Sequence, residues 1–226
     1  YQHFGFRKVW LGYFIEEKND FWKCGKLGKY QFDSFKVWLK EAELTENNMF
    51  NNLAARLEEI GINDISIWAI IFNNIVYNST IVQWYVRNID FNLNYDANSI
   101  VTLLGEDFSI STRENAVTSL KETFRYSPIG TELGVGICEI KGNSVVSITR
   151  RPWANPEPLV ILYSLYKFAE KSDGYYSFTL SYLCDETIER AGISPTQIFG
   201  IDRKTMKDKL QSLATDYRDF ISVSFS

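Results

Sequence analysis

Apolar residues recur at helical spacing near the start of the chain and define one face of a predicted helix. The apolar face consists of Phe32, Phe35, Trp38, Leu39 and Ala42. The opposite face carries Asp33, Lys36, Lys40 and Glu41. This division is typical of an amphipathic helix that packs one side against a core. We therefore expect a helix after the turn at Leu27-Gly28, with Trp38 anchoring the core.

A second helix and a β-hairpin are predicted in the middle of the chain. The run Ser111–Glu114 has the form of a capping box, which marks a helix start. The apolar stripe of this helix is Val117, Leu120 and Phe124. We expect it to end at Ser127-Pro128, because proline cannot continue a helix. Beyond it, two apolar segments, 135–140 and 145–148, flank Lys141–Ser144, which predicts the hairpin.

A third group of elements is predicted near the carboxyl end. Residues 159–168 are largely apolar and predict a buried helix. Asp202 is a favourable N-cap for a further helix. The inward positions of that helix are Met206, Leu210 and Leu213. The last residues, Phe220–Phe225, alternate between apolar and polar, which predicts a strand.

A helix, a turn, a second helix and then a strand or hairpin make up the winged form of the helix-turn-helix. Two segments between the first two groups, Ile65–Tyr77 and Ile81–Ile89, are apolar almost all round. Such segments are typical of buried packing helices. We therefore expect a mainly α fold with small β-hairpins (α+β), built from tandem winged-helix or helix-turn-helix modules around a central helical pair.

Prolines mark the clearest boundary in the chain. Three of them fall within Pro152–Pro158, where neither a helix nor a central strand can continue. We expect four segments in all. These are an amino-terminal helix-turn-helix-like module over 1–60, central packing helices over 61–96, a second winged-helix-like module over 97–151 and a third over 152–226.

The balance of charged residues limits how the chain can bind nucleic acid. The 226 residues carry 24 Lys and Arg against 28 Asp and Glu, which gives a net charge of −4 and a pI of about 5.2. This balance argues against tight non-specific binding to nucleic acid. Residues 46–110 hold two basic and eight acidic side chains, so the basic residues lie before and after an acidic middle. No apolar run is long enough for a membrane span and no signal peptide opens the chain, so we expect a cytoplasmic protein without a membrane partner.

Few residues suit catalysis or metal binding. A single histidine, His3, cannot form a two-histidine metal site by itself. Cys24, Cys138 and Cys184 lie far apart, so we expect packed or free thiols. The chain contains no glycine-rich phosphate loop and no G-x-S-x-G motif. We expect no metal, no cofactor and no catalytic residue; Cys24, which two lysines flank, is a minor alternative as a reactive thiol.

Several stretches carry a family resemblance: His3–Arg7 with Trp10-Leu11, Ser34–Leu44, Ile67–Ile70 with Trp84-Tyr85, Ser127–Gly134 and Ile193–Ile201. Together they resemble the bacterial domain-of-unknown-function family numbered four thousand and seven. Members are often labelled phosphoadenosine phosphosulfate reductase, and their genes lie near sulfur-transfer and DNA phosphorothioation or related phage-defence genes. The label implies a Ser-Gly-Gly-x-Asp-Ser phosphate loop, which this chain lacks.

These observations favour a non-enzymatic, DNA-binding component of a bacterial DNA-modification or phage-defence system. In tandem winged helices a helix enters the major groove and basic side chains meet phosphates. The candidate contacts are Lys29, Tyr30, Lys36, Lys40, Arg113, Asn115, Lys121, Arg125, Arg203, Lys204 and Lys207. Each of these residues could also be an ordinary solvated side chain.

Two alternatives stay open. The first is a protein-interaction scaffold for a sulfur-transfer or restriction complex, in which the acidic middle faces a basic partner. The second is an enzyme of sulfur metabolism. The sequence specifies neither the DNA sequence recognised, nor the protein partner, nor the oligomeric state.

Overall fold

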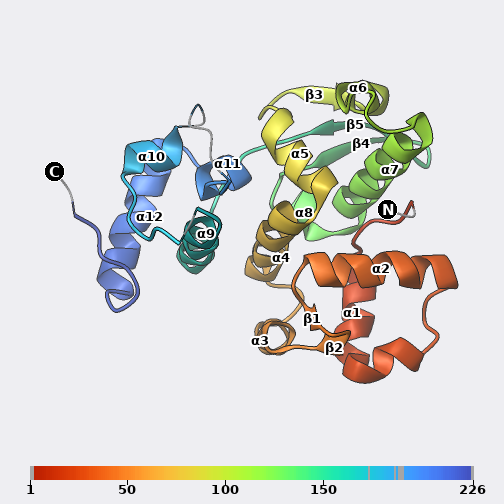
Figure 1. Ribbon diagram of the computed structural model, residues 1–226, viewed down its shortest axis with the longest axis horizontal. Helices are drawn as coiled ribbons and strands as arrows, with labels where there is room; N and C mark the ends of the chain where they lie inside the picture. Colours follow the sequence, from red (N-terminus) through yellow and green to blue (C-terminus); the bar gives the residue numbers. More distant parts are fainter. Residues whose placement is uncertain (1–2, 173, 186, 188–190, 225–226) are drawn as a thin grey trace. The chain divides into compact units, whose positions relative to one another are not determined.

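The computed structural model describes residues 3–172, 174–185, 187 and 191–224 (Figure 1). The chain is mainly helical with small antiparallel sheets, as the α+β prediction states. It divides into two compact units, residues 1–151 and 152–226. The segments expected over 1–60, 61–96 and 97–151 thus lie together in the first unit. Each unit is described separately below.

The amino-terminal part of the first unit is helical with one short hairpin. Its elements are α1 (Lys8–Glu17), the 3-10 helix η1 (Lys18–Lys23), α2 (Lys29–Glu41), β1 (Thr45–Glu46), β2 (Met49–Phe50) and α3 (Asn52–Ile60). The predicted helix after Leu27-Gly28 is α2. Its residues Phe35, Trp38 and Leu39 are buried, which confirms the predicted apolar face.

An aromatic cluster forms the core under α1 and α2. The Phe6 ring meets Phe35 and Trp68 edge to face, with centroid distances of 5.4 and 5.9 Å. Trp38 is fully buried, and its indole N–H donates to the carbonyl of Phe4 at 2.8 Å. Edge-to-face packing suits the ring quadrupole, and the hydrogen bond satisfies the only polar atom of the indole. The prediction that Trp38 anchors this core is confirmed.

Two central helices follow, as the sequence predicts. They are α4 (Ile65–Asn78) and α5 (Thr80–Asn88), and they meet at an angle of 98° where Ser79 is extended. Nearly every side chain of α4 between Ile67 and Val76 is buried, which explains why its sequence has no polar face. In the described residues no single helix is long and apolar enough to cross a membrane; α4 and α5 together pass that test by length and composition only.

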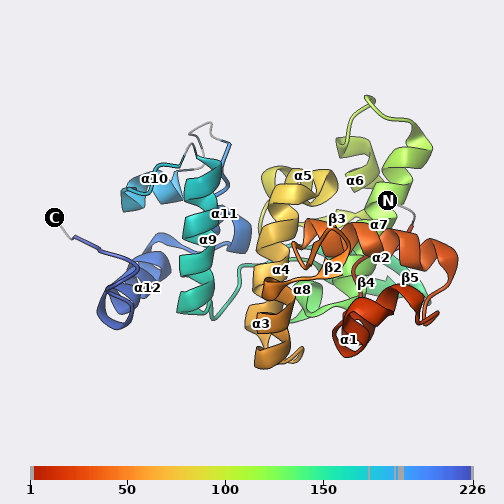
Figure 2. The ribbon, with the colours of Figure 1, turned by 60° about the horizontal axis from the view of Figure 1, so that its bottom comes forward.

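The rest of the first unit joins three helices to a three-stranded sheet. The elements are β3 (Asn94–Asp96), α6 (Ala97–Leu103), α7 (Ile110–Tyr126), α8 (Pro128–Thr131), β4 (Ile137–Lys141) and β5 (Ser144–Thr149). The strands are antiparallel in the order β3-β5-β4, and α7 packs against β4 and β5 (Figures 1 and 2). The predicted hairpin is β4–β5, and the predicted helix end at Ser127-Pro128 is confirmed.

The start of α7 differs from the prediction. The N-cap is Ser109, whose hydroxyl accepts the amide hydrogen of Thr112 at 3.3 Å. Ser111, the predicted cap, lies inside the first turn of the helix. Both serines have the right chemistry, and only Ser109 stands where the backbone is still non-helical, as an N-cap requires.

The described residues of the second unit form four helices. They are α9 (Pro158–Lys171), α10 (Leu180–Cys184), α11 (Pro195–Phe199) and α12 (Arg203–Asp216). α9 and α12 lie side by side in both ribbon views (Figures 1 and 2). The predicted inward positions of α12 are buried: Met206, Leu210 and Leu213.

The strand predicted over Phe220–Phe225 is wrong for its described residues. Residues 218–220 form a turn, and 221–224 have no regular structure. The carbonyl of Phe220 accepts the Tyr166 hydroxyl at 2.9 Å instead of a strand neighbour. A strand needs a partner for its backbone groups, and the described part of this unit contains none. Phe225 lies outside the described residues.

Candidate nucleic-acid interface

A tight turn joins α11 to α12 in the second unit. Ser194 caps α11, and Pro195 occupies its first position, where the absence of an amide hydrogen costs nothing. Gly200 ends α11 with φ 68° and ψ 28°, a left-handed conformation that glycine adopts without strain. Only Gly200, Ile201 and Asp202 separate the two helices. A three-residue turn containing glycine is characteristic of a helix-turn-helix.

Asp202 fixes the beginning of α12. Its carboxylate accepts the amide hydrogens of Lys204 and Thr205, both at 2.9 Å, and the Thr205 hydroxyl at 2.7 Å. The amide and hydroxyl of Thr205, with the Lys204 amide, hold the pKa of Asp202 below its usual range. The predicted N-cap is therefore confirmed.

Apolar contacts set the angle at which α11 meets its neighbours. Ile198, Phe199 and Ile201 are buried. The Trp153 ring lies 5.3 Å from the Phe199 ring, and its amide donates to the Phe199 carbonyl at 2.8 Å. Packed apolar side chains therefore support the turn. They also fix the orientation of α12 within the second unit.

Three of the predicted contacts lie on the first two turns of α12. Arg203, Lys204 and Lys207 are all exposed. At 100° per residue they fall within an arc of about 100° on one side of the helix. Arg203 donates to the Ser181 hydroxyl of α10 at 3.0 Å, and Lys204 pairs with Asp208 at 3.3 Å. The Lys204 side chain is 89% exposed, so that pair is weak.

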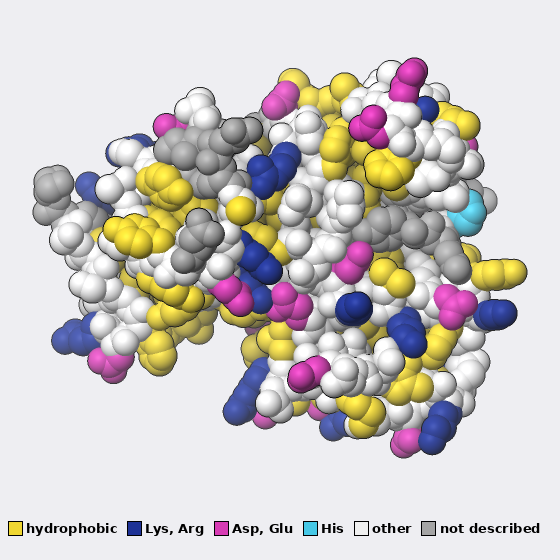
Figure 3. All heavy atoms as spheres, in the orientation of Figure 1, with side chains coloured by type: hydrophobic (Ala, Val, Ile, Leu, Met, Phe, Trp, Pro, Cys, Tyr) yellow, Lys and Arg dark blue, Asp and Glu magenta, His cyan; other side chains and the backbone are white. Residues whose placement is uncertain are grey.

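Four predicted contacts lie on α2 of the first unit. They are Lys29, Tyr30, Lys36 and Lys40, and all are exposed. The spacing puts the three lysines on one line along the helix, with Asp33 among them. The Lys36 ammonium lies 6.0 Å from the Trp22 ring centroid. Basic and acidic side chains are interspersed over the visible face of this unit (Figure 3).

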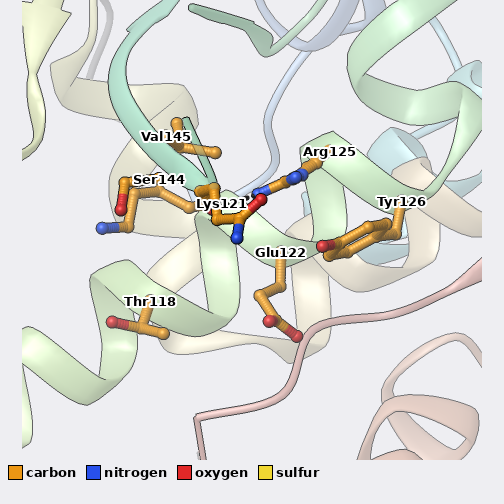
Figure 4. Close-up of a pocket in the computed structure, with 8 residues that line it drawn as sticks. Thr118, Lys121, Glu122, Arg125, Tyr126, Ser144 and Val145 are labelled. Carbon is orange, nitrogen blue, oxygen red and sulfur yellow. Dashed lines mark hydrogen bonds between the residues drawn. The ribbon is translucent and has the colours of Figure 1, made fainter. Parts of the chain in front are cut away.

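The four predicted contacts on α7 separate into two pairs. Arg113 donates to the Val101 carbonyl at 3.3 Å and so ties α7 to α6, and Asn115 nearby is half-buried. Lys121 and Arg125, one turn apart, line a hollow between α7 and the β4–β5 hairpin (Figure 4). The Arg125 guanidinium donates to the Asn143 carbonyl in the hairpin turn at 2.6 Å.

The amino-terminal segment covers another face of α7, which the sequence did not reveal. The Phe6 amide donates to the Thr123 hydroxyl at 2.9 Å, and Arg7 pairs with Glu122 at 2.5 Å. The Arg7 guanidinium lies 4.6 Å from the Trp10 ring and 4.5 Å from the Tyr126 ring. The only signal in the sequence was the compact run His3–Arg7. This face of α7 is occupied by the chain itself.

Arg150 is a second charged residue that sequence reasoning missed. It is buried, and its Nη1 donates to the carbonyls of Val86 and Ile89, each at 2.8 Å. These carbonyls lie at the carboxyl end of α5, the negative end of the helix dipole. Its guanidinium also lies 3.9 Å from the Phe91 ring. Arg150 therefore fastens the end of β5 to α5 and has a structural role.

The three cysteines, Cys24, Cys138 and Cys184, are half-buried and form no disulfide in the described part of the chain. Burial raises the pKa of Cys138 to about 11, although the nearby Arg125 and Lys121 lower it. Within the described ranges, no three His, Cys, Asp or Glu side chains lie close enough together to hold a metal ion.

Comparisons of the chain with protein-family models, with curated proteins and with solved structures find no significant match.

Proposed function

We propose that this chain is a non-enzymatic DNA-binding protein whose main contact with the duplex is the second unit. The observation that carries the proposal is the α11–turn–α12 unit with three exposed cations on the first turns of α12. In a helix-turn-helix the second helix enters the major groove, and its amino-terminal residues reach the bases. Arg203, Lys204 and Lys207 occupy that part of α12, where we expect their cations to meet the phosphates that border the groove.

The charge of these side chains suits the phosphate backbone. The positive end of the α12 dipole adds to the three cations. Because the whole chain carries a net charge of −4, non-specific attraction is weak and binding depends on this local cluster. We therefore expect affinity that falls steeply with salt.

The arrangement of the first unit supports a DNA-associated fold. A helix, a strand, three helices and a hairpin follow one another as α5, β3, α6, α7, the short α8 and β4–β5. The strand order β3-β5-β4 puts the last strand between the other two. We interpret this as a winged-helix module in which α7 is partly covered by the segment around Phe6. The family resemblance supports a role in a DNA-modification or phage-defence system.

A salt titration tests the proposal. The variant Arg203→Ala/Lys204→Ala/Lys207→Ala is compared with the unaltered chain by fluorescence anisotropy on a random-sequence duplex. Each lost phosphate contact lowers the slope of log affinity against log salt by about 0.9, so we expect a decrease of about 2.7. The matched control is Lys23→Ala/Arg56→Ala/Lys171→Ala, which removes the same charge from exposed positions elsewhere.

Three outcomes separate the possibilities. A decrease in salt slope that occurs in the α12 triple variant and not in the control triple variant supports the proposal. Equal slopes in these two variants contradict it. The variant Lys36→Ala/Lys40→Ala measures the contribution of α2, which is about two in slope if both lysines meet phosphates. No binding by the intact chain at low salt favours a scaffold.

The scaffold is the second candidate because of one exposed apolar group between α6 and α7. Leu103, Phe108 and Ile110 are 52%, 58% and 55% exposed. Glu106 and Asp107 stand between them in the chain. Exposed apolar side chains that cluster often mark a protein contact. If the chain is a scaffold, polar substitution of these three residues should weaken its complex with a protein partner and leave its affinity for duplex DNA unchanged.

A further inference from the structure

A hollow between α7 and the β4–β5 hairpin brings the cations Lys121 and Arg125 together with hydroxyl groups. It has a volume of about 190 Å³. Its walls are Thr118, Lys121, Glu122, Arg125, Tyr126, Asn143, Ser144 and Val145. Figure 4 shows Lys121 and Arg125, from α7, beside Ser144 of the hairpin.

The two cations lack a neutralising partner on the protein. Lys121 and Arg125 are four residues apart, a spacing at which like charges on a helix repel. Neither forms an ion pair with any carboxylate in the described part of the chain. The one carboxylate in the wall, Glu122, is taken by Arg7 at 2.5 Å. The hollow therefore keeps an excess of positive charge.

Neutral hydrogen-bond donors complete the walls. The hydroxyls of Thr118 and Ser144 and the side-chain amide of Asn143 line the same space. Arg125 uses Nη1 on the Asn143 carbonyl, which holds the guanidinium beside the hairpin and leaves its other N–H groups for a ligand. Two cations, of which Arg125 is held in place, with hydroxyl and amide donors are the chemistry that recognises a phosphate oxyanion.

The size of the hollow limits the ligand. Drug-sized ligands occupy pockets of roughly 300–1,000 Å³, so a whole nucleotide does not fit inside. A single phosphate group fits, with the rest of its molecule outside.

We propose that this hollow binds one phosphate group, carried either by a nucleic-acid backbone or by a small phosphorylated compound. The site belongs to the first unit and uses none of the α12 residues. The proposal therefore stands or falls independently of the duplex contact assigned to the second unit.

The first experiment measures binding of inorganic phosphate to the full chain by thermal shift, with chloride adjusted to keep the ionic strength equal. We expect a saturable rise in melting temperature in the millimolar range. Lys121→Gln should weaken the apparent affinity about tenfold or more, since it removes a charged hydrogen-bond donor. Arg125 also holds the hairpin, so Thr118→Val serves as the second variant in place of an Arg125 substitution.

The control is Lys141→Gln, on the same hairpin but outside the hollow. Lys141 is exposed and lies 3.9 Å from Glu139, so its loss changes net charge equally without touching the site. The proposal is overturned if phosphate raises the melting temperature of Lys121→Gln as much as it raises that of the unaltered chain. An equal loss of phosphate affinity in Lys141→Gln also overturns the proposal, because it would show a general effect of charge.

The second experiment identifies the source of the phosphate. In the duplex titration, Lys121→Gln lowers the salt slope by about 0.9 if the hollow receives a backbone phosphate. An unchanged slope together with the phosphate response points to a small phosphorylated compound. Absence of both effects overturns the proposal.

Discussion

At the residue scale, Trp38 joins two kinds of stabilisation in one side chain. It fills the core between α2 and the Phe6 ring, and its N–H meets a backbone carbonyl from a segment 34 positions away. Helical spacing alone predicted its burial. The hydrogen bond to Phe4 was not predictable, because it depends on where the amino-terminal segment lies.

Trp38→Ala should lower the free energy of unfolding by roughly 3–5 kcal/mol, the range for emptying a large aromatic site. Trp38→Phe keeps most of the apolar contact and loses the hydrogen bond, so we expect a smaller loss of about 1–2 kcal/mol. Urea unfolding followed by circular dichroism measures both. An unchanged midpoint for the alanine variant would show that this site does not support the fold.

Cys138 gives a prediction about reactivity. Its pKa of about 11 means that the thiolate, the reactive form, is scarce at neutral pH. Alkylation at Cys138, followed site by site with mass spectrometry, should therefore accelerate about tenfold per pH unit and level off only near pH 11. A plateau near pH 8.5, the ordinary thiol value, would contradict this.

The raised pKa of Cys138 also affects the pH dependence of stability. The folded pKa of Cys138 is raised above the unfolded value of about 8.5. Its contribution to stability is therefore complete below about pH 8.5 and declines as the pH rises toward 11. Cys138→Ala should remove this part of the alkaline destabilisation.

At the scale of elements, the helices with a clear apolar pattern were predictable, and the short strands β1, β2 and β3 were not. The apolar faces of α2, α7 and α12 follow the helical period, and α4 reads as buried on all sides. β3 is only three residues long, Asn-Tyr-Asp, and shows no apolar pattern. It exists because β5 offers it a partner, and because Asn94 donates to the hydroxyls of Ser147 and Thr149.

The cap of α12 is testable at this scale. Asp202→Ala should lower the free energy of unfolding of the second unit by about 0.5–2 kcal/mol, the usual effect of losing an N-cap. Asp202→Asn keeps the acceptor and should cost less. Thermal melts of the full chain measure the difference, and equal melts for all three proteins would show that the cap is dispensable.

The pH dependence of this cap has a definite sign. The folded pKa of Asp202 is lowered, while the unfolded value is about 3.9. The stabilisation is therefore present above about pH 4 and is lost as the pH falls through the folded value. Asp202→Asn should show a flatter acid limb than the unaltered chain below about pH 4. A parallel acid limb would assign the acid sensitivity to other carboxylates.

At the scale of the whole molecule, the sequence predicted which helix faces carry cations. It did not predict which of these cations lie together at one site. Lys121 and Arg125 are neighbours on α7 by spacing alone. The hydroxyls that complete their hollow come partly from the hairpin turn, whose position depends on packing that no local pattern encodes. Arg113 stands on the same helix and turns instead to a carbonyl of α6. The start of α12 was the exception, since the N-cap Asp202 marks it locally.

The close approach of Gly5 to α7 bears on how the chain is made. A Cβ atom at Gly5 would lie 2.2 Å from the amide nitrogen of Thr123, so the segment before α1 lies directly against a helix that is synthesised much later. Phe6 and Thr123 are 117 positions apart. At about 5–20 residues per second, the ribosome takes on the order of ten seconds to cover that interval. During that time Phe6 and Trp10 have no finished core to enter, and so distant a closure slows folding. The nascent segment around Phe6 and Trp10 is thus a natural client for chaperones that shield aromatic side chains.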